Sequence, residues 1–119
     1  MEYLDDQEDF ERMIGRGSNN EEDPKKVPMS GSIVIYFGAT WCGPCKRVAP
    51  KVMELMAANK QIRWMKCDVD RNSYTPTYCN VKGIPAFLAI QDMKIVGQAQ
   101  ISDAAKLAEW VDQIFPNKG

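Results

Sequence analysis

The chain has 119 residues, of which 45% are hydrophobic and 26% charged, which is the usual balance for one soluble globular domain. Fifteen basic and sixteen acidic residues give a net charge of −1, and no basic run interleaves with aromatic residues, so nucleic-acid binding is not supported. An acidic first segment and the lack of a long apolar stretch predict neither a targeting peptide nor a membrane span, and we expect a cytoplasmic monomer.

The sequence contains four cysteines and no histidine. A domain of this size can bury a self-sufficient core without structural disulfides, so its cysteines are available for chemistry. Cys42 and Cys45 form a CxxC pair, whereas Cys67 and Cys79 stand apart. A zinc site usually requires two close pairs or histidine ligands, so the spacing favours redox chemistry and predicts no bound metal.

The first third of the chain predicts one helix and two strands. A short strand is expected at Tyr3 and Leu4, followed by a helix over Asp5–Ile14, where apolar residues recur at helical spacing. Residues 15–32 are rich in Gly, Ser, Asn, Pro and charge, which predicts a flexible, insertion-like connector within a single domain over 1–119. The run IVIYF at 33–37 suits a central strand that is covered on both faces.

Strands and helices alternate over the rest of the chain. Apolar residues share one face over 46–58, which predicts an amphipathic helix that Pro50 bends. Further strands are expected at 62–69, 86–90 and 94–100, a short helix at 74–78, and a last helix capped by Ser102. This order predicts an α/β fold, with a central mixed sheet of about five strands flanked by about four helices in three layers.

The CxxC pair lies where a helix is predicted to begin. Cys42 precedes a helix that Pro44 helps to start, so the helix dipole and unpaired backbone N–H groups lower the pKa of the Cys42 thiol. Cys42 is therefore the predicted nucleophile. Cys45 follows one turn later, where we expect stronger shielding, and it suits the resolving role of attacking the mixed disulfide on Cys42.

The motif WCGPC at 41–45, followed by Lys46, resembles the active site of thioredoxins, and VKGIPAF at 81–87 resembles the segment that carries their cis-proline. Nearly all of the chain outside 15–32 is similar to this family. The resemblance implies a thioredoxin fold and a protein disulfide reductase that works through a reversible Cys42–Cys45 disulfide. It also implies that no cofactor is bound, that electrons come from NADPH through a flavin-dependent thioredoxin reductase, and that disulfide-containing proteins are the clients.

The resemblance also assigns the surroundings of the two cysteines. Supporting positions in the active site are Trp41, Gly43, Pro44, Tyr36 and Lys66. The flat apolar surface that receives client disulfides is expected to consist of Trp41, Ile84, Pro85 and Ala86. Pro85 beside the sulfurs would block a metal ion. A purely structural place for Trp41 in the core is the alternative at that position.

Some positions depart from the family pattern. Thioredoxins usually carry a buried Asp where Tyr36 stands, six residues before the nucleophile, and that carboxylate moves a proton to and from the resolving cysteine. A phenol has a pKa of about 10, which burial raises, so Tyr36 is poorly suited to this task, and Lys66 is another candidate for it. Gly38, Ala86 and Ile101 also stand where other residues are usual, which leaves the choice of partners open.

The remaining cysteines and the function itself leave alternatives. Cys67 lies within a predicted strand and is interpreted as a core residue. Cys79 lies before Pro85, close to a place where some eukaryotic thioredoxins carry an extra reactive cysteine, so a regulatory role is a hypothesis. The missing carboxylate motivates a second function: a thioredoxin-fold binding subunit that uses the surface of Trp41 and Pro85 without obligatory redox turnover.

Overall fold

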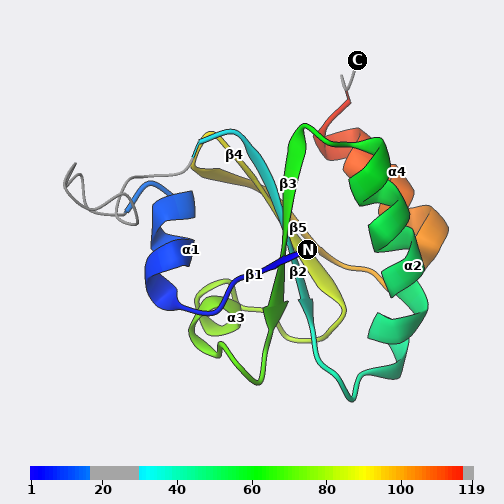
Figure 1. Cartoon of the computed structure of the whole chain (residues 1–119), viewed down its shortest axis with the longest axis horizontal. Coiled ribbons are helices and arrows are strands. Elements are labelled where there is room, and N and C mark those ends of the chain that lie inside the picture. Colours follow the sequence, from blue (N-terminus) through cyan, green and yellow to red (C-terminus); the bar gives the residue numbers. More distant parts are fainter. Residues whose placement is uncertain (17–29, 117–119) are drawn as a thin grey trace.

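The computed structural model describes residues 1–16 and 30–116 (Figure 1). Most of the connector predicted at 15–32 therefore lies outside the described residues. The strands are β1 Glu2–Tyr3, β2 Ser32–Gly38, β3 Ile62–Asp68, β4 Ala86–Gln91 and β5 Lys94–Gln100. The helices are α1 Gln7–Met13, α2 Gly43–Ala58, α3 Tyr74–Tyr78 and α4 Ala104–Ile114.

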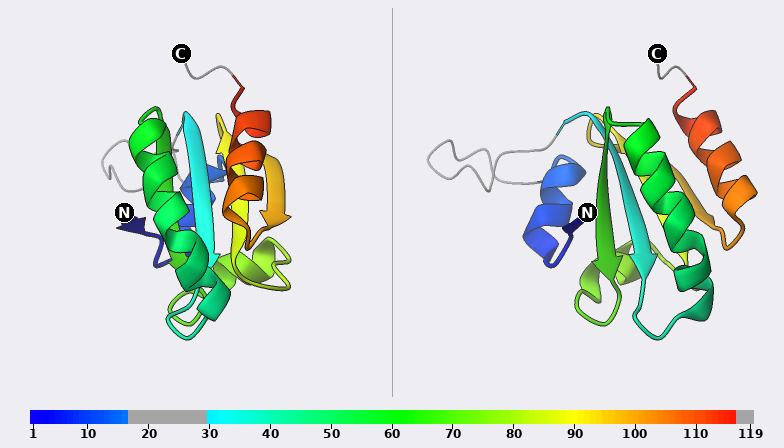
Figure 2. Two further views of the ribbon diagram at one scale, coloured as in Figure 1. Left: turned by 90° about the vertical axis from the view of Figure 1, so that its right-hand side faces the viewer. Right: turned by 45° about the vertical axis from the view of Figure 1, so that its right-hand side comes forward.

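The strands form one mixed sheet in the order β1-β3-β2-β4-β5. β1 and β2 both run parallel to β3, whereas β4 is antiparallel to β2 and to β5. Helices α2 and α4 cover one face of this sheet, and α1 and α3 cover the other (Figure 2). The predicted fold class, a three-layer α/β sheet of five strands with four helices, is confirmed.

The central strand β2 is buried on both faces, as its unbroken apolar sequence predicts. Ile33, Ile35 and Phe37 belong to the core cluster on the side of α1 and α3. Val34 and Tyr36 belong to the cluster that contains the buried faces of α2 and α4. The alternation of a β-strand therefore places the Tyr36 side chain on the α2 side of the sheet, which is the side of the cysteine pair.

The structure shows how two helices are capped. Helix α2 begins at Gly43, with Cys42 as its N-cap and Pro44 in its first turn, which confirms the helix start predicted next to the cysteine pair. Helix α4 is capped by Asp103 and not by Ser102, since the Asp103 carboxylate accepts a hydrogen bond of 2.9 Å from the Lys106 backbone N–H. Over residues 1–16 and 30–116, no helix is long and apolar enough to cross a membrane.

Candidate active site

The cysteine pair lies at the N-terminal end of α2. Figure 1 shows that this end of the helix follows directly after the loop from β2. Cys42 and Cys45 form a disulfide bond, and their Cα atoms are 5.2 Å apart. The Cys45 backbone N–H donates to Cys42 Sγ over 3.2 Å. A thiolate formed on Cys42 after reduction would meet the same N–H group and the positive end of the helix dipole. The local structure therefore supports Cys42 as the nucleophile.

The two active-site cysteines are equally buried in this oxidised state. Cys42 is 4% exposed and Cys45 is 3% exposed, so the expectation that Cys45 is distinctly more shielded is wrong here. The reason is packing: Ala39, Val69 and Ile84 lie against the pair and cover both sulfurs. Access to Cys42 must therefore come from the surface next to these residues.

The loop before β4 lies beside the disulfide. The Ile84–Pro85 peptide bond is cis, and the Ile84 carbonyl oxygen lies 3.9 Å from Cys42 Sγ. Pro85 is buried and Ala86 is only 3% exposed, so the prediction that their side chains form part of the flat surface is wrong for both residues. The reason is the position of Ala86 at the start of β4, where its side chain packs into the core cluster on the side of α1 and α3.

Trp41 is 66% exposed, which excludes a role as a core residue. Its indole N–H donates to the Asp70 carboxylate over 2.8 Å, so the ring is held at the surface by a residue that follows β3. Beside it lies a hollow of about 380 Å³, which we name the Trp41 hollow. This hollow is lined by Trp41, Val69, Pro76, Val81, Lys82, Gly83 and Ile84. An open, largely apolar surface thus adjoins the sulfurs, as a protein client would require.

The Tyr36 side chain contacts the cysteine pair at the backbone of Cys45. Its hydroxyl donates to the Cys45 carbonyl oxygen over 2.9 Å, and its ring stacks on Phe87 at a centroid distance of 5.1 Å. Lys66 Nζ lies 5.5 Å from the centre of the Tyr36 ring. Burial raises the pKa of Tyr36, so the phenol stays neutral and acts as a hydrogen-bond donor. Tyr36 is therefore a positioning residue for Cys45.

Two glycines leave space around the pair. A Cβ atom on Gly38 would lie 3.5 Å from both Cys45 Sγ and an edge carbon of the Tyr36 ring, which is ordinary contact. A Cβ atom on Gly43 would lie 3.7 Å from a guanidinium nitrogen of Arg47. Sequence analysis did not identify Arg47, although its position four residues after Gly43 places both on one face of α2. Asp70 was also missed as the partner of Trp41, because only the fold brings them together.

The other two cysteines lie in the apolar core on the side of α1 and α3. Cys67 is 0% exposed, which confirms the prediction of a core residue, and Cys79 is 9% exposed. Burial raises the pKa of the Cys67 thiol to about 12 and that of the Cys79 thiol to about 11. Both thiols stay protonated near neutral pH. A regulatory role for Cys79 remains a prediction, and it would require this region to open.

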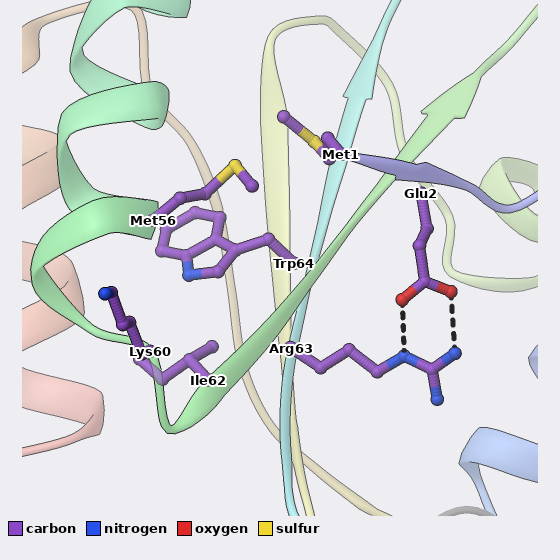
Figure 3. Close-up of a pocket in the computed structure, with 7 residues that line it drawn as sticks. All are labelled: Met1, Glu2, Met56, Lys60, Ile62, Arg63 and Trp64. Atoms are coloured by element: carbon purple, nitrogen blue, oxygen red, sulfur yellow. Dashed lines mark hydrogen bonds and ion pairs between the residues drawn. The ribbon is translucent and has the colours of Figure 1, made fainter.

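A larger hollow of about 550 Å³ lies where the C-terminal end of α2 meets the start of β3 (Figure 3). Its ionisable residues are Glu2, Lys60 and Arg63, and the Glu2 carboxylate accepts hydrogen bonds of 3.0 and 2.7 Å from the Arg63 guanidinium. No cysteine lines it. In the described part of the chain, no group of His, Cys, Asp and Glu side chains could hold a metal ion. The cysteine pair therefore remains the candidate site.

Comparison with known proteins agrees with this geometry. The family model described as "Thioredoxin" matches residues 18–113. The chain belongs to the thioredoxin family. Thioredoxins are protein-disulfide oxidoreductases without a bound cofactor, and Cys42 and Cys45 supply the redox-active disulfide of that chemistry here.

Individual thioredoxins match the chain over most of its length. Mitochondrial thioredoxin-3 of Saccharomyces cerevisiae is 35% identical over 85 residues, which cover 71% of this chain and 67% of that protein. The crystal structure of its oxidised form has a TM-score of 0.68 and 32% identity, and the match covers 71% of this chain and 80% of that chain. The chain spans about two thirds of the length of the curated thioredoxins that it matches first.

A further structural match is a chain from a study of how a yeast mitochondrial 1-Cys peroxiredoxin is resolved through the glutathione and thioredoxin systems. It has a TM-score of 0.79 and 26% identity, and the match covers 95% of this chain and 94% of that chain. This structural match therefore covers more of the protein than the match to thioredoxin-3 does.

Proposed function

We propose that this protein reduces disulfide bonds in client proteins by thiol–disulfide exchange. One observation carries the proposal: a Cys42–Cys45 disulfide at the start of α2 lies beside the cis Ile84–Pro85 bond and adjoins an open apolar hollow. A structural disulfide would have no need of an adjacent surface for another chain, whereas a redox-active disulfide requires one.

The reaction proceeds in two exchange steps. In the reduced protein, the Cys42 thiolate attacks one sulfur of the client disulfide, the client S–S bond breaks, and the departing client thiolate takes up a proton. A mixed disulfide then links Cys42 to the client. The Cys45 thiolate attacks Cys42 Sγ, the mixed disulfide breaks, and the second client thiolate leaves and is protonated. Two electrons have passed to the client, and the Cys42–Cys45 disulfide has formed.

We extend the proposal to the partners and the compartment. Electrons would return from NADPH through a flavin-dependent thioredoxin reductase, as is usual in this family. The similarity to a chain studied with a 1-Cys peroxiredoxin supports a thiol peroxidase as one kind of client. Cys67 and Cys79 are free thiols, which suits a reducing compartment, and we propose a single-domain monomer in the cytoplasm. Cell fractionation and light scattering would test these last points.

Reduction of insulin disulfides tests the reductase function. The wild type should reduce insulin in the presence of dithiothreitol, while Cys42→Ser should fall to the rate of dithiothreitol alone because no nucleophile remains. Cys67→Ala is the matched control, since it removes a cysteine without touching the site, and should retain the wild-type rate. A wild type that is no faster than Cys42→Ser would exclude the reductase function.

The second candidate is a binding subunit that holds a partner through the exposed Trp41 and the surface near Pro85. It is favoured by the neutral Tyr36 phenol, which supplies no base to the resolving thiol. A variant with serine at both Cys42 and Cys45 separates the two functions. If this variant restores every phenotype of a deletion strain, binding is the function; if it restores none, redox turnover is required.

A further inference from the structure

Lys82 lies between two hollows next to the active site. It is the single ionisable residue among those that line the Trp41 hollow. A second hollow of about 270 Å³, which we name the Gln98 hollow, shares Val81, Lys82 and Gly83 with it. The other lining residues of the Gln98 hollow are Asn80, Ala86, Gln98, Ala99 and Gln100. All of these are uncharged, so the Lys82 ammonium supplies the charge at both hollows.

The charge of Lys82 is not neutralised within the described part of the protein. The ion pairs found there involve Arg12, Lys51, Arg63 and Arg71, and none includes Lys82. The acidic residue in contact with Trp41 is Asp70, and its carboxylate already accepts a hydrogen bond from the Trp41 indole. An incoming chain in the Trp41 hollow would therefore meet a free, exposed ammonium group.

Arg47 adds a second positive charge near the cysteines. One of its guanidinium nitrogens would lie 3.7 Å from a Cβ atom placed on Gly43, so the Arg47 head group is next to the turn that contains the two cysteines. Lys82 and Arg47 together bring two positive charges to the surroundings of the cysteine pair, against the one carboxylate of Asp70 beside Trp41. Such a field raises the encounter rate of segments with negative charge.

We infer that this protein prefers client disulfides whose cysteine has an acidic residue close to it in sequence, with Lys82 as the residue that selects for it. The inference rests on the proposed function and adds a substrate class. Lys82 is two residues before Ile84, whose carbonyl oxygen is 3.9 Å from Cys42 Sγ. Because an extended chain advances about 3.3 Å per residue, the matching acid lies within about three residues of the attacked cysteine.

Two disulfide peptides that differ at two positions test the inference. One carries Glu at the second and third positions from its cysteine, and the other carries Lys there. The pre-reduced full-length protein reduces each peptide in a single turnover, and each rate is divided by the rate with dithiothreitol, which corrects for intrinsic reactivity. We expect the wild type to favour the Glu peptide about three- to fivefold at low salt, and less at high salt because ions screen the pair.

Three variants assign the effect. Lys82→Gln should remove most of the preference, leaving only the contribution of Arg47, and Lys82→Glu should reverse it. Lys60→Glu makes the same charge change at the far end of α2, about 24 Å from Cys42 by helix length, and should keep the wild-type preference. Circular dichroism confirms that each variant is folded, which is expected because both lysines are exposed.

The outcomes separate this inference from the proposed function. Equal normalised rates for the two peptides with a wild type that reduces insulin would overturn the charge preference and leave the reductase function intact. A preference that survives in Lys82→Glu would also overturn it, because another residue would then be responsible. A wild type that reduces neither insulin nor either peptide would overturn both.

Discussion

The protein contains two sets of cysteines that are buried to a similar degree and yet differ in chemistry. Cys42 and Cys45 are 4% and 3% exposed, and Cys67 and Cys79 are 0% and 9% exposed. The first set lies at a helix N-terminus, where a backbone N–H donates to Cys42 Sγ. The second set lies in an apolar cluster that raises both thiol pKa values. Burial alone therefore does not determine reactivity; the polarity of the immediate surroundings does.

Alkylation of the reduced protein should show the largest contrast. At pH 7.5, a thiol with a pKa of about 11 is ionised in roughly one molecule in 3,000, and a thiol with a pKa of about 12 in roughly one in 30,000. The helix N-terminus, in contrast, favours the Cys42 thiolate. Iodoacetamide should modify Cys42 at least about 100-fold faster than Cys67 or Cys79, as followed by peptide mass mapping. In urea the four rates should converge. Rapid labelling of Cys79 in the native protein would break the contrast and support a regulatory thiol there.

The second prediction concerns Tyr36, whose neutral phenol supports Cys45 but cannot accept its proton. Resolution of the mixed disulfide should be slow near pH 7 and should accelerate as rising pH populates the Cys45 thiolate. Tyr36→Asp should speed resolution severalfold near pH 7 and flatten the pH profile. Stopped-flow kinetics of the second exchange step measures this effect.

The control for that experiment is Tyr36→Asn, which creates the same space without a carboxylate. Both variants lose the stacking on Phe87 and should be destabilised by about 3–5 kcal/mol, as for loss of a buried aromatic ring. Urea titration verifies that they remain folded. If Tyr36→Asp and Tyr36→Asn resolve at the same rate with the same pH dependence, the acid–base account of this position is wrong, and Lys66 becomes the candidate.

A smaller effect should appear in the stability of the oxidised protein at high pH. The folded-state pKa values of Cys67 and Cys79 are raised to about 12 and about 11, whereas a cysteine thiol in the unfolded chain has a pKa of about 8.5. Above that value the unfolded state loses its protons first, and each thiol lowers the free energy of unfolding by up to about 1.4 kcal/mol per pH unit.

The control is the double variant Cys67→Ala, Cys79→Ala, compared by urea titration between pH 8.5 and 10.5. Its free energy of unfolding should fall less steeply with pH than that of the wild type, because the variant lacks the two thiols whose pKa values rise on folding. At pH 7 the double variant should be less stable by about 1–2 kcal/mol, because two buried sulfurs are removed. Identical slopes would show that the two thiols are not shielded from ionisation in the folded state.

Local features of the site could be predicted from the sequence. The buried strand β2, the CxxC pair and the helix start at Pro44 depend on residues that are neighbours in sequence, and the structure confirms all three predictions. The identity of a helix cap is harder to predict, because Ser102 and Asp103 are both good N-cap residues. In the structure Asp103 has the extended backbone conformation of an N-cap.

Contacts between distant segments could not be predicted. The bond from Trp41 to Asp70, the approach of Ile84 to Cys42 and the packing of Ala86 into the core depend on how β2, β3 and β4 are aligned in the sheet. The Tyr36 hydrogen bond to the Cys45 carbonyl likewise requires α2 to pack on the face to which that strand position points. Sequence spacing contains no direct signal for these contacts.

In the proposed mechanism, Cys42 alone attacks the client and Cys45 alone resolves the intermediate. This mechanism is tested most directly by mixing reduced Cys45→Ser with a disulfide peptide and locating the trapped mixed disulfide by peptide mass mapping without reduction. We expect a stable adduct on Cys42 and none on Cys67 or Cys79. An adduct on either buried cysteine, or no adduct in Cys45→Ser under conditions where the wild type reduces the peptide, would contradict it.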